Sequence, residues 1–543
     1  MITGLKIDEA QKALYYQKGY WTHESLGDVW ARQAKAFAND EYVADDQGTR
    51  FTYGEVEDKA SRLATWLIEQ GVQVGDVVSF QIPNWAEFTI VYVACLKVGA
   101  VMHPVAKNFN AADLRFVMNQ VSSVAFFCPA RFHGCDFEYT AIEVQKDVPT
   151  LKTIAIVEKH EKSTSGLPTL NQIIATHEPL TKYPQVDPDS VACLLSTSGT
   201  TGRPKAVMLT HNNIHFSERE FGRFLGLTKE DVAFMPSPLN HATGFFHGLL
   251  TPMILGGRAV VQQIYHADTA IHLMNEERCT WSMGATPFVY DILHHAEDTG
   301  EKPETLRLFC CGGAPVPGIM VDKAHQVGFL LCEVYGSTES CPHAAVPPEK
   351  CLEWNGAWSG IPIEGIEVRA VDANGNDVPT GQQGEEISRG PHQFVGYLNN
   401  PEKTAEALDD NGWFYSGDLC SMSTDGKIRI NGRKKEIIIR GGENISANEI
   451  DADLMQMPGM GAHATIGMPD ERLGERICTF YVPEDPTRPL TLDQVKEYMQ
   501  AQGVAKRLWP ERIEPIEELP TTPTGKIQRF KLADELKRRM EQD

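Results

Sequence analysis

Apolar runs typical of strands alternate with helical patterns through much of the chain. Residues 77–82 form a short apolar run, a helical pattern covers 85–98, and a second run follows at 99–104. The same rhythm returns at 153–157, 306–310 and 329–334. This alternation predicts a parallel α/β sheet, and folds of that kind place their sites in the loops that follow the strands.

The pattern changes after about residue 365. Short alternating runs with turns, such as 366–371 before the turn at 372–375, predict a smaller antiparallel β lobe. Next, the polar segment 432–436 separates two apolar stretches, and enough chain follows it for a compact α+β domain. We therefore expect an α/β fold with a large N-terminal domain over 1–432, a joint at 433–435 and a small C-terminal domain over 436–543.

Length and charge narrow the class of protein. A chain of 543 residues exceeds what one hydrophobic core supports, so two or more domains are expected. With 42% hydrophobic and 23% charged residues the composition is that of a globular protein. The net charge of −23 repels nucleic acid and anionic membranes, so an anionic substrate must meet a locally positive site.

Cysteine usage and apolar runs indicate the compartment. The 12 cysteines are scattered, apart from Cys310-Cys311, and form no CxxC pair, so neither a disulfide framework nor a zinc cluster is expected. The first 20 residues are interrupted by charges and lack the apolar run of a secretory signal. No stretch reaches the roughly 18 apolar residues that span a bilayer. These features predict a soluble, cytoplasmic protein.

The strongest chemical signal is the segment 194–205, Leu-Leu-Ser-Thr-Ser-Gly-Thr-Thr-Gly-Arg-Pro-Lys. A short apolar strand opens there into hydroxyls and glycines whose backbone N–H groups can surround phosphate oxygens. The Walker pattern is excluded, because a proline precedes Lys205 and no Ser or Thr follows it. A bare stretch of this composition is more often a solvated linker, so the rest of the chain must decide.

This arrangement resembles the phosphate loop of the adenylate-forming superfamily, which comprises acyl-CoA synthetases, luciferases and peptide-synthetase adenylation domains. Four further segments match that family in the right order, and the resemblance covers nearly the full length. They are 335–339 (YGSTE), 415–418 (YSGD), 432–435 (GRKK) leading to 441–444 (GGEN), and 523–526 (PTGK). The sequence as a whole is most similar to those of the bacterial short- and medium-chain fatty acyl-CoA synthetases.

The resemblance assigns the ATP site. Glu339 would hold Mg²⁺, because a hard cation prefers oxygen ligands. Asp418 would accept hydrogen bonds from the ribose hydroxyls, with Arg433 beside it. Taken singly, such charged residues are more often solvated, and the motif context makes the assignment. The implied ATP and AMP contacts are Thr197, Ser198, Gly199, Thr200, Thr201, Gly202, Lys205, Gly313, Ala314, Pro315, Tyr335, Gly336, Ser337, Thr338, Asp418 and Arg433.

The resemblance also assigns the two chemical steps. Lys526 would stabilise charge on the carboxylate and α-phosphate oxygens in the first step. No protein nucleophile is needed in the second step, since the mixed anhydride is already activated. The C-terminal domain would rotate about Lys435 between the steps and exchange Lys526 for the CoA-binding loop. That loop is expected to contain Gly441, Gly442 and Glu443.

The acid is expected in an apolar pocket. His241 resembles the family residue that gates this pocket and touches ATP, although a histidine considered alone is more often structural. The predicted wall contains Phe245, Gly284, Ala285 and Cys311. These residues offer no charge to pair with an amino acid's ammonium group, so a hydrophobic acid is favoured.

The resemblance therefore predicts an ATP- and Mg²⁺-dependent acid:CoA ligase of fatty acid metabolism, with catalytic residues Lys526, Glu339 and His241. A stand-alone enzyme that loads a carrier protein is the main alternative; a luciferase-like oxidase and a non-catalytic binding module are weaker ones. The acid, a homodimer and regulation by acetylation of Lys526 stay open. Three small departures from the family pattern, Ala206, Ser416 and Thr521, are expected to be tolerated. A fourth, Arg507-Leu508 in place of Tyr-Lys, leaves docking of the C-terminal domain in question.

Overall fold

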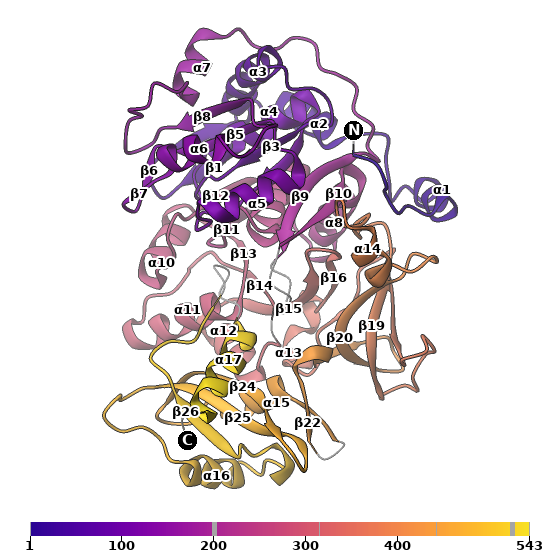
Figure 1. Cartoon of the computed structure of the whole chain (residues 1–543), viewed down its shortest axis with the longest axis vertical. Coiled ribbons are helices and arrows are strands. Elements are labelled where there is room, and N and C mark those ends of the chain that lie inside the picture. Colours follow the sequence, from indigo (N-terminus) through magenta and orange to yellow (C-terminus); the bar gives the residue numbers. More distant parts are fainter. Residues whose placement is uncertain (1, 198–203, 314, 441–442, 522–526, 542–543) are drawn as a thin grey trace. The chain divides into compact units, whose positions relative to one another are not determined.

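The computed structural model describes residues 2–197, 204–313, 315–440, 443–521 and 527–541 (Figure 1). These residues divide into two compact units. The first contains Met1–Asn355, Ile361–Glu367 and Ser388–Phe414, and the second contains Gly356–Gly360, Val368–Ile387 and Tyr415–Asp543. The predicted joint at 433–435 is a hinge about which the C-terminal domain rotates. The division into compact units does not test a rotation, so this joint stays a prediction.

Two sheets form the first unit, as the alternating pattern predicted. One has nine described strands in the order β17-β16-β15-β14-β13-β11-β12-β1-β2 and is parallel from β15 to β1. The strands are β1 (Glu41–Asp45), β2 (Arg50–Thr52), β11 (Val232–Met235), β12 (Arg258–Val261), β13 (Trp281–Gly284), β14 (Leu308–Gly312), β15 (Leu330–Ser337), β16 (Cys341–Ala345) and β17 (Ile361–Pro362). Helices α11 (Thr286–Thr299) and α12 (Gly318–Val327) make the crossovers from β13 to β14 and from β14 to β15.

The other sheet has the order β10-β9-β4-β3-β5-β8 among the described strands. It is parallel from β9 to β8, and β10 pairs antiparallel with β9. The strands are β3 (Val77–Phe80), β4 (Val101–Pro104), β5 (Ala125–Pro129), β8 (Thr153–Val157), β9 (Val191–Thr197) and β10 (Lys205–Thr210). Helix α4 (Glu87–Val98) joins β3 to β4 and is apolar and buried on nearly every side, which is the pattern of a helix enclosed by other layers.

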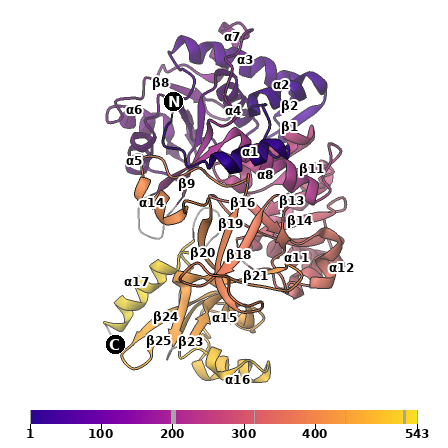
Figure 2. The same cartoon turned by 90° about the vertical axis from the view of Figure 1, so that its right-hand side faces the viewer.

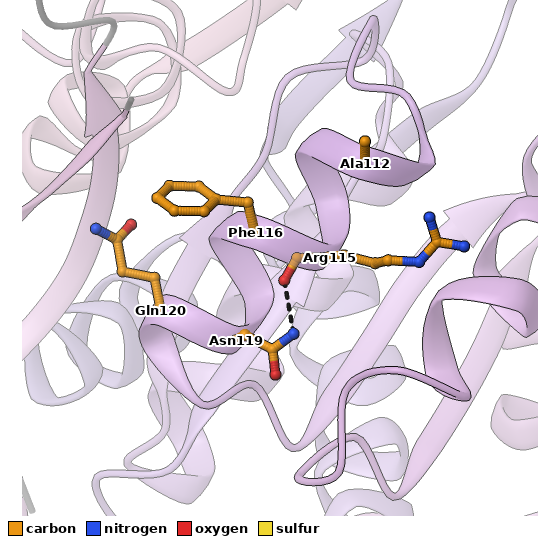
Figure 3. Close-up of a pocket in the computed structure, with 5 residues that line it drawn as sticks. All are labelled: Ala112, Arg115, Phe116, Asn119 and Gln120. Atoms are coloured by element: carbon orange, nitrogen blue, oxygen red, sulfur yellow. Dashed lines mark hydrogen bonds between the residues drawn. The ribbon is translucent and has the colours of Figure 1, made fainter. Parts of the chain in front are cut away.

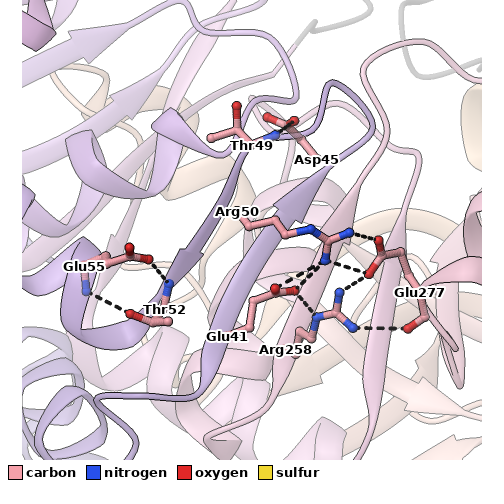
Figure 4. A network of polar contacts seen from close by, with 8 residues as sticks. All are labelled: Glu41, Asp45, Thr49, Arg50, Thr52, Glu55, Arg258 and Glu277. Atoms are coloured by element: carbon pink, nitrogen blue, oxygen red, sulfur yellow. Dashed lines mark hydrogen bonds and ion pairs between the residues drawn. The ribbon is translucent and has the colours of Figure 1, made fainter.

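A network of four charges ties the edge of the nine-stranded sheet together (Figure 4). Arg50 of β2 and Arg258 of β12 both bond to Glu41 of β1, at 3.2 Å and 2.5 Å, and both also bond to Glu277. Burial opposes ionisation of Glu277, but the hydrogen bonds from the two guanidinium groups outweigh it and lower the pKa of its carboxyl. The network therefore fastens β1, β2 and β12 to one another and to the end of helix α10 (Ala267–Glu276).

The second unit begins with the β lobe predicted after residue 365 (Figure 2). Its four described strands run in the order β18-β19-β20-β21, and β20 and β21 pair antiparallel. They are β18 (Glu367–Val371), β19 (Gln383–Arg389), β20 (Phe414–Met422) and β21 (Ile428–Arg433).

The rest of the second unit is the predicted α+β domain. Its sheet contains β22 (Ile437–Arg440), β23 (Glu443–Ser446), β24 (Met460–Asp470), β25 (Gly474–Pro483) and β26 (Arg512–Pro515). Side chains alternate along β25, so that Ile477 and Tyr481 join a core with α15 (Ala447–Leu454) and α16 (Leu492–Ala501). Cys478 and Phe480 join a second core with α17 (Arg529–Met540).

No helix within the described ranges has both the length and the apolar character needed to cross a lipid bilayer.

Candidate active site

The β9–β10 hairpin presents the two ends of the predicted phosphate loop. Thr197 at the end of β9 pairs with Lys205 at the start of β10, and Ser196 pairs with Ala206. The hydroxyl of Thr197 is buried and has no hydrogen-bond partner among the described residues. A buried hydroxyl of this kind is costly unless it is satisfied, which fits a position that awaits a ligand oxygen.

Several predicted site residues fall outside the described ranges. They are Ser198, Gly199, Thr200, Thr201, Gly202, Ala314, Gly441, Gly442 and Lys526.

Lys205, Glu339 and Tyr397 form a polar cluster beside the hairpin. Lys205 Nζ lies 4.0 Å from Glu339 Oε1 and 3.9 Å from the centre of the Tyr397 ring. The Tyr397 hydroxyl donates a hydrogen bond of 2.9 Å to Glu339 Oε1. Burial and the neighbouring carboxylate raise the pKa of Tyr397, so its hydroxyl stays protonated and is a donor.

Sequence reasoning missed Tyr397, which lies about sixty residues after Glu339. The chain reaches the cluster because residues 395–398 pair with β10: Met208 donates to the carbonyl of Gly396 at 3.0 Å and Leu398 donates to that of Ala206 at 2.9 Å. The only signal in the sequence was an aromatic residue after a glycine in an otherwise irregular stretch.

Glu339 lies in the turn that joins β15 to β16, and this turn is tight. The backbone N–H of Phe394 donates to the carbonyl of Glu339 at 2.7 Å, which fixes the main chain there. Ser337 and Ser340 bond across the turn through their hydroxyls at 3.0 Å. A Cβ atom on Gly336 would lie 1.9 Å from the carbonyl oxygen of Cys341, so only glycine fits at this position.

The predicted adenine wall also depends on close backbone approach. A Cβ atom on Gly312 would lie 3.0 Å from the carbonyl oxygen of Val334, and Gly313 adopts a φ of 92°. The ring of Tyr335 packs edge-on against His343, with centroids 4.8 Å apart. After Pro315, the backbone N–H of Val316 donates to Glu333 Oε2 at 2.8 Å and holds the turn on β15.

Asp418 and Arg433, both predicted at the ribose, lie opposite each other on β20 and β21 of the second unit. Arg433 Nε lies 3.4 Å from Asp418 Oδ1. Ser416, which replaces the usual threonine, donates to the carbonyl of Glu386 at 2.8 Å and accepts from the backbone N–H of Asp418 at 3.0 Å. A hydroxyl is all that this position uses, which explains why serine is tolerated.

Two other departures from the family pattern also have local explanations. Ala206 is fully buried in β10 within the core beside β9, where one methyl group is accommodated. Leu508 is buried in the core formed by α15 and α16, and Arg507 lies 4.0 Å from Glu449.

The predicted acyl wall is partly assembled in the first unit. Gly284 and Cys311 are paired neighbours on β13 and β14, and Ala285 caps α11. A Cβ atom on Gly284 would lie 2.7 Å from the ring of Phe288. Thus Gly284, Ala285 and Cys311 lie together at the carboxyl ends of two strands.

Phe245 lies in the first turn of a π-helix, η1 (Thr243–Leu250), and His241 lies just before that helix. His241 Nδ1 accepts a hydrogen bond from the backbone N–H of Thr243 at 3.3 Å. The Phe245 ring is buried against Phe88 and Tyr92 of α4, with centroids 5.2 Å and 5.3 Å away. Short π-helical segments occur frequently at functional sites.

A shallow hollow of about 670 Å³ lies on helix α5 (Ala111–Val121) (Figure 3). It contains none of the predicted site residues. Gln120, at its edge, donates from its side chain to the carbonyl of Pro204 at 3.2 Å, and its backbone carbonyl accepts from the side chain of Asn399 at 3.3 Å. Helix α5 thus supports the end of the phosphate loop and the start of the segment after Tyr397.

The residues of the cluster fit ATP and Mg²⁺. No group of three His, Cys, Asp or Glu side chains that could hold a metal occurs in the described part of the chain. Mg²⁺ bound with a nucleotide needs only one or two carboxylates, because phosphate oxygens and waters complete its shell. Glu339 can supply that carboxylate, and Lys205 can supply a cation for the phosphates.

We expect Tyr397→Phe to lower the ATP-dependent rate about tenfold, because the Glu339 carboxylate loses a hydrogen bond while Lys205 keeps an aromatic ring beneath it. The measurement is acid-dependent pyrophosphate release as a function of Mg²⁺ concentration, with a higher Mg²⁺ requirement expected in the variant. Tyr397→Leu is the matched variant that removes the ring as well, and the rate should fall further in it than in Tyr397→Phe. An unchanged Mg²⁺ dependence in both variants would contradict a role for Tyr397 in placing Glu339.

Comparisons with known proteins agree with the motifs and the fold. The sequence matches the family model of the AMP-binding enzyme over residues 30–398 and that of the AMP-binding enzyme C-terminal domain over 449–526. A medium-chain fatty-acid–CoA ligase of Escherichia coli (strain K12) is 43% identical over 539 residues, which are 99% of this chain and 95% of that protein. Enterobactin synthase component E of the same organism is 28% identical over 95% of each chain.

Solved structures show the same fold. ATP-bound MatB from Rhodopseudomonas palustris superposes with a TM-score of 0.85 at 25% identity, covering 95% of this chain and 99% of that one. The anthranilate CoA ligase AuaEII, in complex with anthranoyl-AMP, superposes with a TM-score of 0.86 at 22% identity, covering 95% and 97%. Ligases of this type use ATP, Mg²⁺ and CoA, as the sequence resemblance implied. The chain therefore belongs to the AMP-binding enzymes of the adenylate-forming superfamily, and within them it is an AMP-forming acid–thiol ligase of the acyl-CoA synthetase type.

Proposed function

We propose that the protein joins a medium-chain fatty acid, or a similar hydrophobic acid, to CoA. In the first step the carboxylate attacks the α-phosphate of ATP, giving an acyl adenylate and pyrophosphate. In the second step the CoA thiol attacks the acyl carbonyl, giving acyl-CoA and AMP. The single observation that carries the choice of acid is the 43% identity, over 99% of this chain, to the E. coli medium-chain fatty-acid–CoA ligase.

The residues of the first unit have proposed roles in the first step. Lys205 offsets phosphate charge, and Glu339 holds Mg²⁺ with its carboxylate oriented by Tyr397. Tyr335 and the turn at Gly313, Ala314 and Pro315 contact the adenine. The hydroxyl and backbone groups of 197–202 and 336–338 contact the phosphates. His241 closes the site on the side where the carboxylate of the acid binds.

The second unit has proposed roles in both steps. Asp418 accepts hydrogen bonds from the ribose hydroxyls, and Arg433 holds that carboxylate in place. Lys526 stabilises the transition state of the first step. Rotation about Lys435 then brings Gly441, Gly442 and Glu443 to the CoA arm in the second step. Asp418 and Arg433 precede Lys435 in the chain, so they keep the AMP while the C-terminal domain turns.

The acid pocket is proposed to form from Gly284, Ala285 and Cys311, with Phe245 behind them. These side chains are apolar or small, and burial raises the pKa of the Cys311 thiol to about 12, so none of these four side chains is an anion at neutral pH. An alkyl chain gains about 0.8 kcal/mol for each buried CH₂ group, so a pocket of fixed depth discriminates by chain length. We also propose a cytoplasmic location, where the buried cysteines stay reduced.

Carrier-protein loading is the second candidate. It is favoured by the similarity to enterobactin synthase component E and to triostin synthetase I of Streptomyces triostinicus, which is 30% identical over 94% of this chain. Neither name is that of a CoA ligase. A separate carrier protein, and a homodimer, are therefore partners to be tested.

The deciding experiment measures AMP and pyrophosphate release with a panel of linear acids from two to sixteen carbons and of cyclic and aromatic acids. CoA and a pantetheinylated carrier protein are compared as acceptors. We expect the highest kcat/KM with linear acids of medium length and CoA. Pyrophosphate release that leads to no acyl-CoA, but to loaded carrier, would establish the second candidate instead.

A further inference from the structure

A chain of four polar side chains crosses the core of the six-stranded sheet toward the phosphate loop. Ser79 of β3 lies directly opposite His103 of β4, and its Oγ lies 2.7 Å from His103 Nδ1. Ser79 Oγ also bonds to Ser123 Oγ, just before β5. On the other side, His103 Nε2 lies 3.3 Å from Ser196 Oγ of β9. The chain thus joins neighbouring strands of one sheet and ends at the last residue but one of β9.

Three of these four groups are sealed from solvent. Ser79, His103 and Ser123 have exposed fractions of 0%, in a sheet that is otherwise apolar here. Buried polar groups of this kind are retained only where their hydrogen bonds are satisfied, and together they specify one arrangement of the core. Ser196 alone is half-buried, and it is followed by Thr197, whose buried hydroxyl has no partner in the described part of the chain.

The imidazole of His103 is neutral. Burial lowers the pKa of His103 to about 3, so at neutral pH one ring nitrogen donates and the other accepts. Two directions of hydrogen bonding through the chain are then conceivable. They differ in whether His103 Nε2 donates to Ser196 or accepts from it.

Ser123 decides between the two directions. Its hydroxyl has Ser79 Oγ as its one hydrogen-bond partner within the described ranges. If Ser123 accepted from Ser79, its own buried proton would have no acceptor, at a cost of about 1–3 kcal/mol. If Ser123 donates to Ser79, then Ser79 donates to His103 Nδ1, and the protons of the three sealed groups are all used. His103 Nε2 then carries the proton and donates to Ser196.

We propose that His103 is a positioning residue for ATP binding, because its Nε2–H occupies a lone pair of Ser196 Oγ and leaves the Ser196 proton free to donate to a phosphate oxygen. The imidazole does not touch the nucleotide. It sets the direction of a hydroxyl at the base of the phosphate loop, and a hydroxyl that donates to a charged oxygen contributes more than a neutral pair does. This inference rests on the proposed ATP site.

The test is equilibrium ATP binding by calorimetry, which needs neither the acid nor CoA. We expect His103→Leu and Ser196→Ala each to raise the ATP Kd about tenfold, and the double variant to raise it little further, because both act on one hydroxyl. His103→Gln should restore most of the affinity, since its amide N–H can reach the place of Nε2–H. Acyl-CoA formation from preformed adenylate should stay within about twofold in all of them, because no ATP is bound in that step.

His211→Leu is the matched control. His211 is also buried in the first unit, and its Nδ1 accepts from the backbone N–H of Leu26 at 3.2 Å, so it takes no part in the hydrogen bonds that end at Ser196. We expect a lower Tm and an unchanged ATP Kd. If His103→Leu does not fold, Ser79→Ala takes its place, because it frees the His103 tautomer without altering the ring.

The outcomes are distinguishable. A folded His103→Leu protein, or its Ser79→Ala substitute, that binds ATP as tightly as the wild type overturns the role of His103. So do additive losses in the double variant. A wild-type protein that binds no ATP overturns the proposed function itself.

Discussion

Lys526→Ala is expected to slow adenylate formation by about a hundredfold to a thousandfold while leaving the thioester step nearly intact. The carboxylate and the α-phosphate are both anionic, and a cation at the end of the Pro-Thr-Gly-Lys motif lowers the barrier to their approach. In the second step the acyl carbonyl that reacts is uncharged, so this step does not depend on the cation. The two steps are measured separately, as acid-dependent pyrophosphate release and as acyl-CoA formation from preformed acyl adenylate.

Lys531→Ala is the matched control for this variant. Lys531 is an exposed lysine near the start of α17, five residues further along the chain, and it should affect neither step. Equal losses of both steps in Lys526→Ala would overturn the assignment of this lysine to the first step alone. They would point instead to a general effect on the C-terminal domain.

Gly336→Ala is expected to destabilise the first unit by about 4 kcal/mol or more. Single substitutions have effects of this size only where they cause strain or a clash that cannot relax. The added Cβ atom would meet a backbone carbonyl, that of Cys341, at 1.9 Å, and no side-chain rotation can remove this overlap. Either the β15–β16 hairpin opens or the protein fails to fold. The Tm and the ATP affinity are the two quantities to measure. Both should fall together, because Tyr335 and Ser337 flank Gly336.

Gly222→Ala is the control for adding a methyl group. Gly222 lies within helix α8 (His211–Phe224), and its Cβ atom would meet the flexible side chain of Leu255 at 3.2 Å. That side chain can move, and alanine favours the helix, so the change in stability should stay within about 1 kcal/mol. Equal Tm values for Gly336→Ala and the wild type would contradict the close approach of the two strands.

The sequence predicted the fold class, the family and the order of the elements, and the structure and comparisons confirm them. The reason is that strand and helix periodicity are local, and the family motifs are short and ordered. The predicted run at 77–82 is β3, the helical pattern over 85–98 contains α4, and the run at 329–334 begins β15. Thr197, Lys205, Tyr335, Glu339, Asp418 and Arg433 all came from motifs of four to twelve residues.

Tertiary structure alone decided which distant residues complete the site. Tyr397 reaches Glu339 because the segment 395–398 pairs with β10, and no local pattern encodes that pairing. His103 reaches Ser196 because β4 and β9 are neighbours in the sheet, although 93 positions separate the two residues. Glycine at 336 could be explained only once the Cys341 carbonyl was seen against it. Local periodicity and motifs are written in consecutive residues, whereas strand order and side-chain packing depend on contacts between segments that the chain brings together only when it folds.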